Sequence, residues 1–321
     1  MISGSITSFN NNSISGVIHK SITNDVSVEI QLIIGGITID VQKINFANDY
    51  HKFSFRSGDE LNIIFNISRV KIMVNNYILP FHNSLKNKII YIDKYLKTQI
   101  RKQFLFLHIP KTAGTTIRNV LYLHYNQESI FPNKRDIKFH SGYPTENFIK
   151  KNSFKKLNNS NLITGHYSYD VSNYFIRIPV IFTVLRDPIE RALSHLFHIK
   201  RHAVGFSDMS LEEILEKAET QISNIQTRYI SGTSSFEISK LDCEQAKLNM
   251  SKMALVGSQN NLEDFFKKLF KLVDMPTRII PVMNSNPDRN KYLKVNSDIL
   301  ENLKQINKYD IELFNLVKNR D

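Results

Sequence analysis

The sequence has one cysteine, no tryptophan and no long apolar run, and each shortage excludes a class of protein or site. With Cys243 alone, neither an intrachain disulfide nor a cysteine-rich metal site can form. No stretch approaches the ~18 consecutive apolar residues that a membrane span needs. The first residues lack the basic start and apolar centre of a signal peptide, so we expect a soluble, cytoplasmic protein.

Acidic residues are scarce relative to basic ones, and the imbalance lies mostly in the later part of the chain. The 321 residues include 42 Lys and Arg against 30 Asp and Glu, a formal charge of +12. Residues 1–100 hold ten of the basic and seven of the acidic side chains. The excess beyond them indicates an anionic partner: a nucleotide, an acidic glycan or a nucleic acid. A generally basic soluble surface would give the same count.

Period-two alternation dominates the first 81 residues. The segment Val26–Ile34 alternates and leads through Gly35 and Gly36 into Ile37–Val41, the pattern of a hairpin. Further short runs follow at roughly ten-residue spacing: His51–Phe55, Leu61–Phe65 and Val70–Val74. This pattern predicts a small all-β, sandwich-like accessory domain over residues 1–81, with a structural or docking role.

The remainder divides into a linker and a second domain. The interval 82–102 is polar and basic around one apolar patch, and we expect it to be the linker. Over 103–321, apolar runs alternate with helical patterns, which predicts an α/β domain with a parallel sheet flanked by helices. The basic stretch 133–156 is expected to be a solvated loop, or alternatively a rim that binds a polyanion. The predicted strands are Phe104–Leu107, Leu162–Gly165, Val180–Leu185, Ala254–Val256 and Ile279–Val282. The later predicted helices are Leu211–Ala218, Gln221–Ile230, Gln245–Met250, Leu262–Val273 and Ser297–Val317.

The first apolar strand of this second domain runs into a loop of small residues and then a helix start. Pro110 ends the strand because it cannot donate to a sheet ladder. The free N–H groups of the following helix turn, with the positive end of its dipole, attract an anion. We interpret the loop as a phosphate cradle, with an ordinary strand-to-helix turn as the alternative. The cradle residues are Lys111, Thr112, Ala113, Gly114, Thr115 and Thr116.

A second anion site is indicated where Val180–Leu185 ends. Arg186 follows directly, Asp187 and Pro188 are typical of a helix N-cap and first helical position, and Ser194 comes about two helical turns later. A guanidinium and a hydroxyl can hold a second phosphate, although a local ion pair between Arg186 and Asp187 is the alternative. Ligands of such sheets bind beyond the carboxyl ends of the strands, so we expect both elements to lie at one edge.

Three segments, in this order, resemble sulfotransferases that use 3′-phosphoadenosine 5′-phosphosulfate (PAPS). The segment Phe106–Thr116 resembles their 5′-phosphosulfate loop, and Val184–Ser194 resembles their 3′-phosphate element. Between them, Gly165–Asp170 is similar to the segment that carries the catalytic base in the heparan sulfate 2-O-sulfotransferase-like branch. The resemblance covers roughly residues 103–320 and implies the P-loop-like sulfotransferase fold. The family's eukaryotic members have a membrane anchor, which is lacking here, so a bacterial, cytoplasmic relative is expected.

The resemblance also implies a role for each matching residue. Lys111 would stabilise the leaving phosphate, with the rest of the cradle around the phosphosulfate, and His166 would be the general base. Arg186 and Ser194 would bind the 3′-phosphate. Two polar clusters also resemble family segments, so Arg289 is expected at the cofactor and Arg228 near the substrate. His140 is the rival base and a candidate substrate contact.

The implied reaction converts PAPS to adenosine 3′,5′-bisphosphate and needs a carbohydrate acceptor, but no metal and no nucleic acid. Sulfuryl transfer relies on positioning and charge stabilisation, and a neutral histidine can take the acceptor's proton. His108 is expected to be structural. One helix face would bring together His195, His198 and His202. The sequence offers no matching ligands elsewhere that would complete a metal site with them.

Two other functions stay open at this point. A P-loop kinase of a small metabolite would need the motif Gly-Lys-Ser/Thr, whereas Lys111 precedes the glycine of the loop. A kinase would also need an Asp that binds magnesium, and Asp187 is the fair candidate for that role. A basic protein that only binds glycans or nucleic acid would leave the two strand-end elements without a role.

Overall fold

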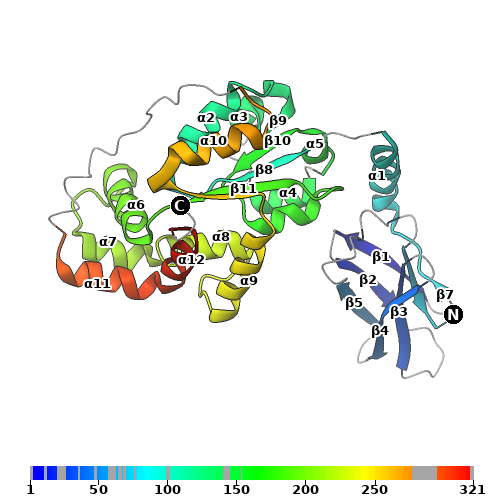
Figure 1. Ribbon diagram of the computed structural model, residues 1–321. Coiled ribbons are helices and arrows are strands. Elements are labelled where there is room, and N and C mark those ends of the chain that lie inside the picture. The colour runs from blue at the N-terminus through cyan, green and yellow to red at the C-terminus, as the bar shows by residue number, and fades with distance from the viewer. Residues whose placement is uncertain are drawn as a thin grey trace. The chain divides into compact units, whose positions relative to one another are not determined.

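The chain forms two compact units in the computed structural model (Figure 1). One unit comprises Met1–Arg101 with Asn173–Ile178, and the other comprises Lys102–Ser172 with Pro179–Asp321. The structure describes residues 3–10, 13–19, 27–34, 37–46, 49–56, 63, 67, 70–75, 77–98, 102–139, 145–152, 154–276 and 295–318.

The first unit contains two antiparallel sheets. One has the order β1–β2–β5, and the other has the order β4–β3–β6–β7. The strands are β1 (Ser3–Phe9), β2 (Ser13–His19), β3 (Ser27–Ile34), β4 (Ile37–Asn45), β5 (Tyr50–Arg56), β6 (Val70–Val74) and β7 (Tyr77–Ile78). In β3 every second residue from Val28 to Ile34 is buried, so the alternation in the sequence corresponds to one buried face. Gly35, Gly36 and most of the predicted strand Leu61–Phe65 lie outside the described residues.

The interval 82–102, expected to be a linker, contains a short 3₁₀ turn at Asn83–Leu85 and helix α1 (Lys86–Thr98). Ile92 of this helix is fully buried. The Lys88 ammonium donates to the Phe9 carbonyl at 3.1 Å and lies 4.1 Å from the centre of the Phe9 ring. The apolar patch in this basic stretch is therefore the buried side of a helix. The polar residues around the patch are the reason why the sequence predicted a linker instead.

In the second unit, five parallel strands among the described residues form a sheet of order β12–β11–β8–β10–β9. The strands are β8 (Phe104–Leu107), β9 (Ile130–Phe131), β10 (Leu162–Gly165), β11 (Val180–Leu185) and β12 (Leu255–Ser258). Three of the predicted strands coincide with β8, β10 and β11, and the strand predicted at Ala254–Val256 is β12, displaced by one to two residues. The two-residue edge strand β9 has too short a pattern to be predicted. The strand predicted at Ile279–Val282 lies outside the described residues.

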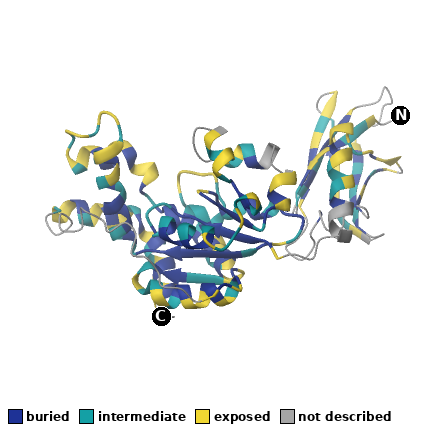
Figure 2. Ribbon diagram, turned by 90° about the horizontal axis from the view of Figure 1, so that it is seen from above, coloured by how far each residue is buried: buried dark blue, intermediate teal, exposed yellow. Residues whose placement is uncertain are grey.

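Helices α2 (Gly114–Tyr122) and α10 (Leu262–Leu272) cover one face of this sheet (Figure 1). Phe104 and Phe106 of β8 and Phe182 of β11 belong to the same buried cluster as residues of these two helices. A second core lies between α6 (Pro188–His202), α7 (Leu211–Ala218) and α11 (Ser297–Ile306). The parallel strands are largely buried, and exposed positions lie on the outer faces of the helices (Figure 2).

Two predictions about helices are corrected. The basic stretch 133–156, expected to be a loop, contains α3 (Lys134–Phe139), α4 (Glu146–Asn152) and most of α5 (Phe154–Asn159). The single helix predicted over Ser297–Val317 is two, because α12 (Lys308–Lys318) begins after a break at Asn307. The buried Asn307 amide donates to the Leu303 carbonyl and accepts from the Asn224 N–H of the segment before α8 (Ile225–Ser231).

Candidate active site

The residues that carry chemistry follow three neighbouring strands at the same edge of the parallel sheet. Leu107 at the end of β8 pairs with Gly165 of β10 on one side and Thr183 of β11 on the other. The cradle, His166 and Arg186 follow these strands directly. The topology therefore brings together the three elements that the sequence separates by up to 75 residues, at the edge where α/β sheets bind ligands.

The backbone of the cradle is in an unusual conformation. Lys111 has φ 71° and Ala113 has φ 67°, and the other described non-glycine residues with positive φ are all Asn or Asp, which tolerate this region. Such backbone strain concentrates at functional sites, and alternation of this kind turns successive N–H groups toward one point. Ala113 is also the N-cap of α2, and its side chain cannot accept from the helix's first N–H groups. These are the features of an anion-binding loop.

Gly114 is required by the close approach of a histidine ring. A Cβ atom at this position would lie 1.8 Å from His108 Cδ2. The His108 ring is buried and stacks on Phe106, with ring centres 5.6 Å apart. Burial, followed by the charges of His166 and Arg118, lowers the pKa of His108 to about 3. His108 is therefore a neutral, packed side chain beneath the cradle, as the sequence predicted.

A contact with the backbone orients the His166 ring. Its Nδ1 atom lies 2.8 Å from the His108 carbonyl oxygen, which can only accept, so Nδ1 carries the proton. The lone pair is then on Nε2. Burial lowers the pKa of His166, the bond to the His108 carbonyl raises it in part, and the charge of Arg118 lowers it further. At neutral pH the imidazole is uncharged and can act as a base.

Arg186 connects the end of β11 to the cradle. Its Nη1 atom donates to the Lys111 carbonyl at 3.3 Å, and its Nη2 atom lies 3.2 Å from a carboxylate oxygen of Glu190. Its Nε atom is buried and has no partner among the described residues. The Gln226 amide pairs with the backbone N–H and carbonyl of Arg186 at 2.9 and 3.0 Å. This glutamine is a positioning residue that the sequence did not reveal.

Asp187 does not form the local ion pair that was the alternative for Arg186. Its carboxylate accepts from the N–H groups of Ile189 and Glu190, both at 3.0 Å, and Pro188 is at the start of α6. The predicted N-cap and first helical position are thus confirmed. In a kinase the Asp187 carboxylate would have to bind magnesium, whereas here it caps helix α6.

One face of α6 is turned toward the cradle lysine. Burial and then the charges of Arg186, Arg201 and Arg191 lower the pKa of Lys111. Burial lowers the pKa of His195 to about 3 and also lowers the pKa of His198, and the charge of Lys111 contributes to both shifts. Arg191, His195 and His198 have the i, i+4, i+7 spacing of a single helix face. The histidine spacing noticed in the sequence therefore reflects this face.

Arg191 was missed in the sequence, and the structure buries it completely. Its Nη2 atom donates to the Ile222 carbonyl at 2.9 Å, while Nε and Nη1 have no partner among the described residues. The buried carboxylate of Asp310 compensates part of the charge, since each residue shifts the pKa of the other toward its charged form. Cationic donors without partners next to the cradle favour an anionic ligand.

The remaining predicted residues have different surroundings. The buried Thr112 hydroxyl donates to the Ile109 carbonyl at 2.9 Å, so it stabilises the loop from within. The Arg228 guanidinium donates to the carbonyls of Thr220 and Phe236 at 2.6 and 2.8 Å, which ties it to the fold. His140 and Arg289 lie outside the described residues.

The described part of the chain contains no group of three or more His, Cys, Asp or Glu residues placed to hold a metal ion. None of its helices has the length and apolar character needed to cross a membrane.

One comparison with known proteins identifies the family of the chain. The sequence model described as the Sulfotransferase family matches residues 94–317, more than two thirds of the chain and all of the strands that position the site. The match specifies no branch within the family. No curated protein and no solved structure gives a significant match. The chain belongs to the sulfotransferase family, and its α/β unit is that of a sulfotransferase.

Proposed function

We propose that this protein transfers a sulfuryl group from PAPS to a hydroxyl group of a carbohydrate. The observation that carries the proposal is the hydrogen bond from His166 Nδ1 to the His108 carbonyl. That bond puts the lone pair of the ring on Nε2. His166 follows β10 and Arg186 follows β11, on opposite sides of the strand β8 that leads into the cradle. A base beside the cradle, with a second anion-binding element on the other side of the cradle, suits a donor with phosphate groups at two ends.

The buried donors of the site fit such a ligand. The cradle would hold the phosphosulfate through Lys111 and the first N–H groups of α2. Arg186, with Ser194 on the neighbouring helix face, would hold the 3′-phosphate. Leaving a buried donor unsatisfied costs about 1–3 kcal/mol, more for a charged group. A second phosphate would offset this cost at Arg186, whose Nε atom has no partner among the described residues.

The chemistry then follows from these residues. His166 Nε2 accepts the proton of the acceptor hydroxyl while the hydroxyl oxygen forms a bond to sulfur. The bond between sulfur and the bridging oxygen breaks, and its electron pair stays on the 5′-phosphate. Lys111 offsets the charge that develops there, as preorganised cations do in group transfer. Every proton and electron pair is accounted for without a metal.

Thermal unfolding with two ligands tests the function. Adenosine 3′,5′-bisphosphate at about 100 times its Kd should stabilise the protein by ~2.7 kcal/mol. We expect this ligand to raise Tm and ATP with magnesium to have little effect. A larger shift with ATP and magnesium would indicate a kinase, and no shift with either would indicate a protein that only binds glycans or nucleic acid.

The Lys111→Ala variant tests the cradle in particular. It should nearly abolish turnover of PAPS and weaken adenosine bisphosphate, because the charge acts on both the bound ligand and the leaving phosphate. Calorimetry and a sulfuryl-transfer assay measure the two effects. Turnover near that of the wild type would contradict the role of the cradle.

A further inference from the structure

The last helix of the described chain supplies a carboxylate that caps another helix. Asp310 of α12 is fully buried, and α12 lies in contact with α8 (Figure 1). One Asp310 oxygen accepts from the Gln226 N–H at 3.0 Å, and the other accepts from the N–H and the hydroxyl of Thr227 at 2.7 and 2.8 Å. Gln226 and Thr227 are in the first turn of α8, whose own N-cap residue, Asn224, makes no capping bond with its side chain. Asp310 therefore takes the place of a local N-cap.

The start of α12 is capped in return by the residue that precedes α8. The Asn224 side-chain oxygen accepts from the N–H groups of Tyr309 and Asp310 at 3.0 and 3.2 Å. Asn224 and Asp310 are both buried. Each helix thus begins on a side chain of the other, and this fixes the position of the first turn of α8 as well as its conformation.

Gln226 transmits this position to the end of β11. Its side-chain oxygen accepts from the Arg186 N–H at 2.9 Å, and its side-chain nitrogen donates to the Arg186 carbonyl at 3.0 Å. Because backbone groups in the interior need partners, the buried amide orients the backbone of Arg186. The Arg186 guanidinium in turn donates to the Lys111 carbonyl of the cradle at 3.3 Å. Hydrogen bonds thus connect α12, through α8 and Arg186, to the cradle.

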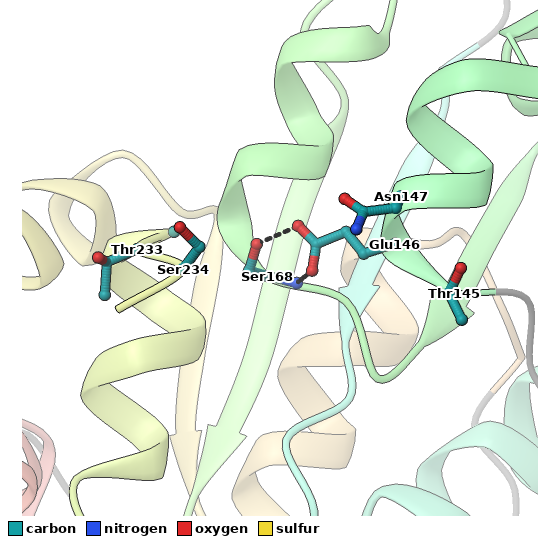
Figure 3. Close-up of a pocket in the computed structure, with 7 residues that line it drawn as sticks. Thr145, Glu146, Asn147, Ser168, Thr233 and Ser234 are labelled. Carbon is teal, nitrogen blue, oxygen red and sulfur yellow. Dashed lines mark hydrogen bonds between the residues drawn. The ribbon is translucent and has the colours of Figure 1, made fainter. Parts of the chain in front are cut away.

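The other end of α8 leads to the surroundings of the proposed base. Gly232–Ser234 follow the helix directly and form one wall of a pocket of about 240 Å³ (Figure 3). The other described lining residues are Thr145–Asn147 and Ser168, which follows His166 by two residues. The two ends of α8 therefore lie at different parts of the candidate site, and a change at one end can be compared with a change at the other.

We propose that Asp310, acting through Gln226 and Arg186, sets the preference of the site for a nucleotide with a 3′-phosphate. The inference rests on the proposed function, in which Arg186 binds that phosphate. A guanidinium binds phosphate through hydrogen bonds of fixed direction, so a small rotation of the arginine weakens them. Asp310 and Gln226 are fully buried, so they are positioning residues that act through Arg186 rather than by contact with the nucleotide.

The ratio of two dissociation constants tests this with Gln226→Leu. Adenosine 3′,5′-bisphosphate has the 3′-phosphate and adenosine 5′-phosphosulfate lacks it, so a general loosening of the fold changes both constants, whereas a misplaced Arg186 changes the first. Leucine is close to glutamine in size and removes both bonds to the Arg186 backbone. We expect calorimetry to show about tenfold weaker binding of the bisphosphate, the smaller loss typical of a charge-assisted bond. Binding of the phosphosulfate should stay within about twofold. An unchanged ratio would overturn the proposal.

Two further variants test the caps. Asp310→Asn should shift the ratio in the same direction, because an amide has one oxygen to accept from the first turn of α8. The Asp310 carboxylate also compensates the buried charge of Arg191, so Asn224→Gly stands beside it in case the asparagine variant does not fold. Asn224 has φ 46°, which glycine adopts without strain, and its replacement removes the bonds to α12. A ratio that stays at the wild-type value in the folded cap variants would remove Asp310 from the proposed role.

A double variant shows whether Gln226 acts through the arginine. In the Arg186→Ala background, Gln226→Leu should weaken the bisphosphate no further than about twofold, because the side chain through which it acts is gone. Losses that add in full would show that Gln226 acts by another route, and would contradict the proposal.

Asn249→Leu is the matched control at the other end of α8. The Asn249 amide is buried in α9 (Lys240–Ser251) and donates to the carbonyls of Ile230 and Ser231 at 2.8 and 3.2 Å. This variant should lower Tm and leave the ratio of the two constants within about twofold of the wild type. A shift equal to that of Gln226→Leu would mean that any disturbance of α8 suffices.

The failure of this inference differs from the failure of the proposed function. If adenosine bisphosphate does not bind the wild-type protein, the proposed function fails. If it binds and PAPS is turned over, but Gln226→Leu leaves the ratio unchanged, the function stands and the positioning role is wrong.

Discussion

The tautomer of the His166 imidazole is set by a carbonyl group that lies 58 residues away in the sequence. The His108 oxygen accepts from Nδ1 and so determines that Nε2 has the lone pair. The same ring is partly removed from water, which lowers its pKa below the ordinary value of about 6.5. His166 is therefore neutral over a wider pH range than an ordinary histidine. As the proposed base, it should shift the acid-side fall of the reaction rate to a lower pH.

His166→Asn tests this at the level of one residue. In the proposed reaction the neutral form of His166 is the active one, so kcat/KM should rise with pH through a midpoint below 6.5 in the wild type. The variant should lose this limb and about 10²–10⁴ in kcat, the usual contribution of a general base. Steady-state rates from pH 4.5 to 8 measure both. Binding of adenosine bisphosphate is the control and should be unchanged, whereas near-normal rates would limit His166 to holding the loop.

Arg186→Ala should separate the two phosphate positions. Loss of a charge-assisted contact typically costs about 1.5–3 kcal/mol, which corresponds to roughly 10- to 100-fold in Kd. We expect this loss for adenosine 3′,5′-bisphosphate and a much smaller one for adenosine 5′-phosphosulfate, which has no 3′-phosphate. Calorimetry with both ligands measures the difference. Because Arg186 also donates to the Lys111 carbonyl, equal losses would mean that it supports the cradle instead.

At the scale of elements, the start of α6 combines a helix cap with Arg186, the residue proposed to bind the 3′-phosphate. Asp187 caps two N–H groups, Pro188 follows, and Arg186 immediately before them points back to the cradle. The cap fixes the direction of the helix, and the helix holds Arg191 and Arg201 close enough to Lys111 for their charges to lower its pKa, after the larger effect of burial. The cap is specified by a few neighbouring residues, yet it positions arginine charges next to Lys111, which is distant in the sequence.

Replacing the cap should change the stability of the protein more than its catalytic activity. Asp187→Ala should lower the free energy of unfolding by about 1 kcal/mol, within the 0.5–2 kcal/mol usual for a lost N-cap. Asp187→Asn should recover most of this, since asparagine caps equally well. Denaturant unfolding measures both variants. If the asparagine variant is stable but inactive, then Asp187 does more than cap the helix.

At the scale of the whole molecule, the site belongs to one of the two units. The cradle, His166, Arg186 and Asp310 all come from Lys102–Ser172 and Pro179–Asp321. The antiparallel sheets of the other unit contribute none of these residues. The other unit does include Asn173–Ile178, in which Phe175 and Ile176 are fully buried, so its boundary is not a single point in the chain.

The fragment 102–321 should therefore keep the binding site. Its affinity for adenosine bisphosphate should match that of the full chain, because no residue of the site is removed. Its solubility should be lower, since Asn173–Ile178 is separated from the rest of its unit. Calorimetry and circular dichroism on the fragment and the full chain are the measurements. A fragment that is folded but does not bind would show that residues 1–101 take part in the site.

The sequence alone was sufficient for features that depend on near neighbours. Apolar runs bounded by Pro110 or by Asp187-Pro188 predicted β8, β11 and the start of α6, because strand ends and helix caps are decided within a few residues. The ends of three parallel strands then predicted that the cradle, His166 and Arg186 meet. Short or polar elements, such as β9 and α1, were missed because their burial depends on partners distant in sequence.

Only the tertiary structure determines which atoms of these residues take part in hydrogen bonds and which charges lie near one another. The Nδ1 proton of His166, the carbonyl groups that occupy Arg228, and the proximity of the α6 face to Lys111 all depend on contacts across the fold. Residue type and spacing do not encode such contacts, because a side chain has the same donors in every sequence while its partners are determined by packing. Asp310 is the clearest case, since its carboxylate accepts from N–H groups that lie 84 and 83 residues earlier in the chain.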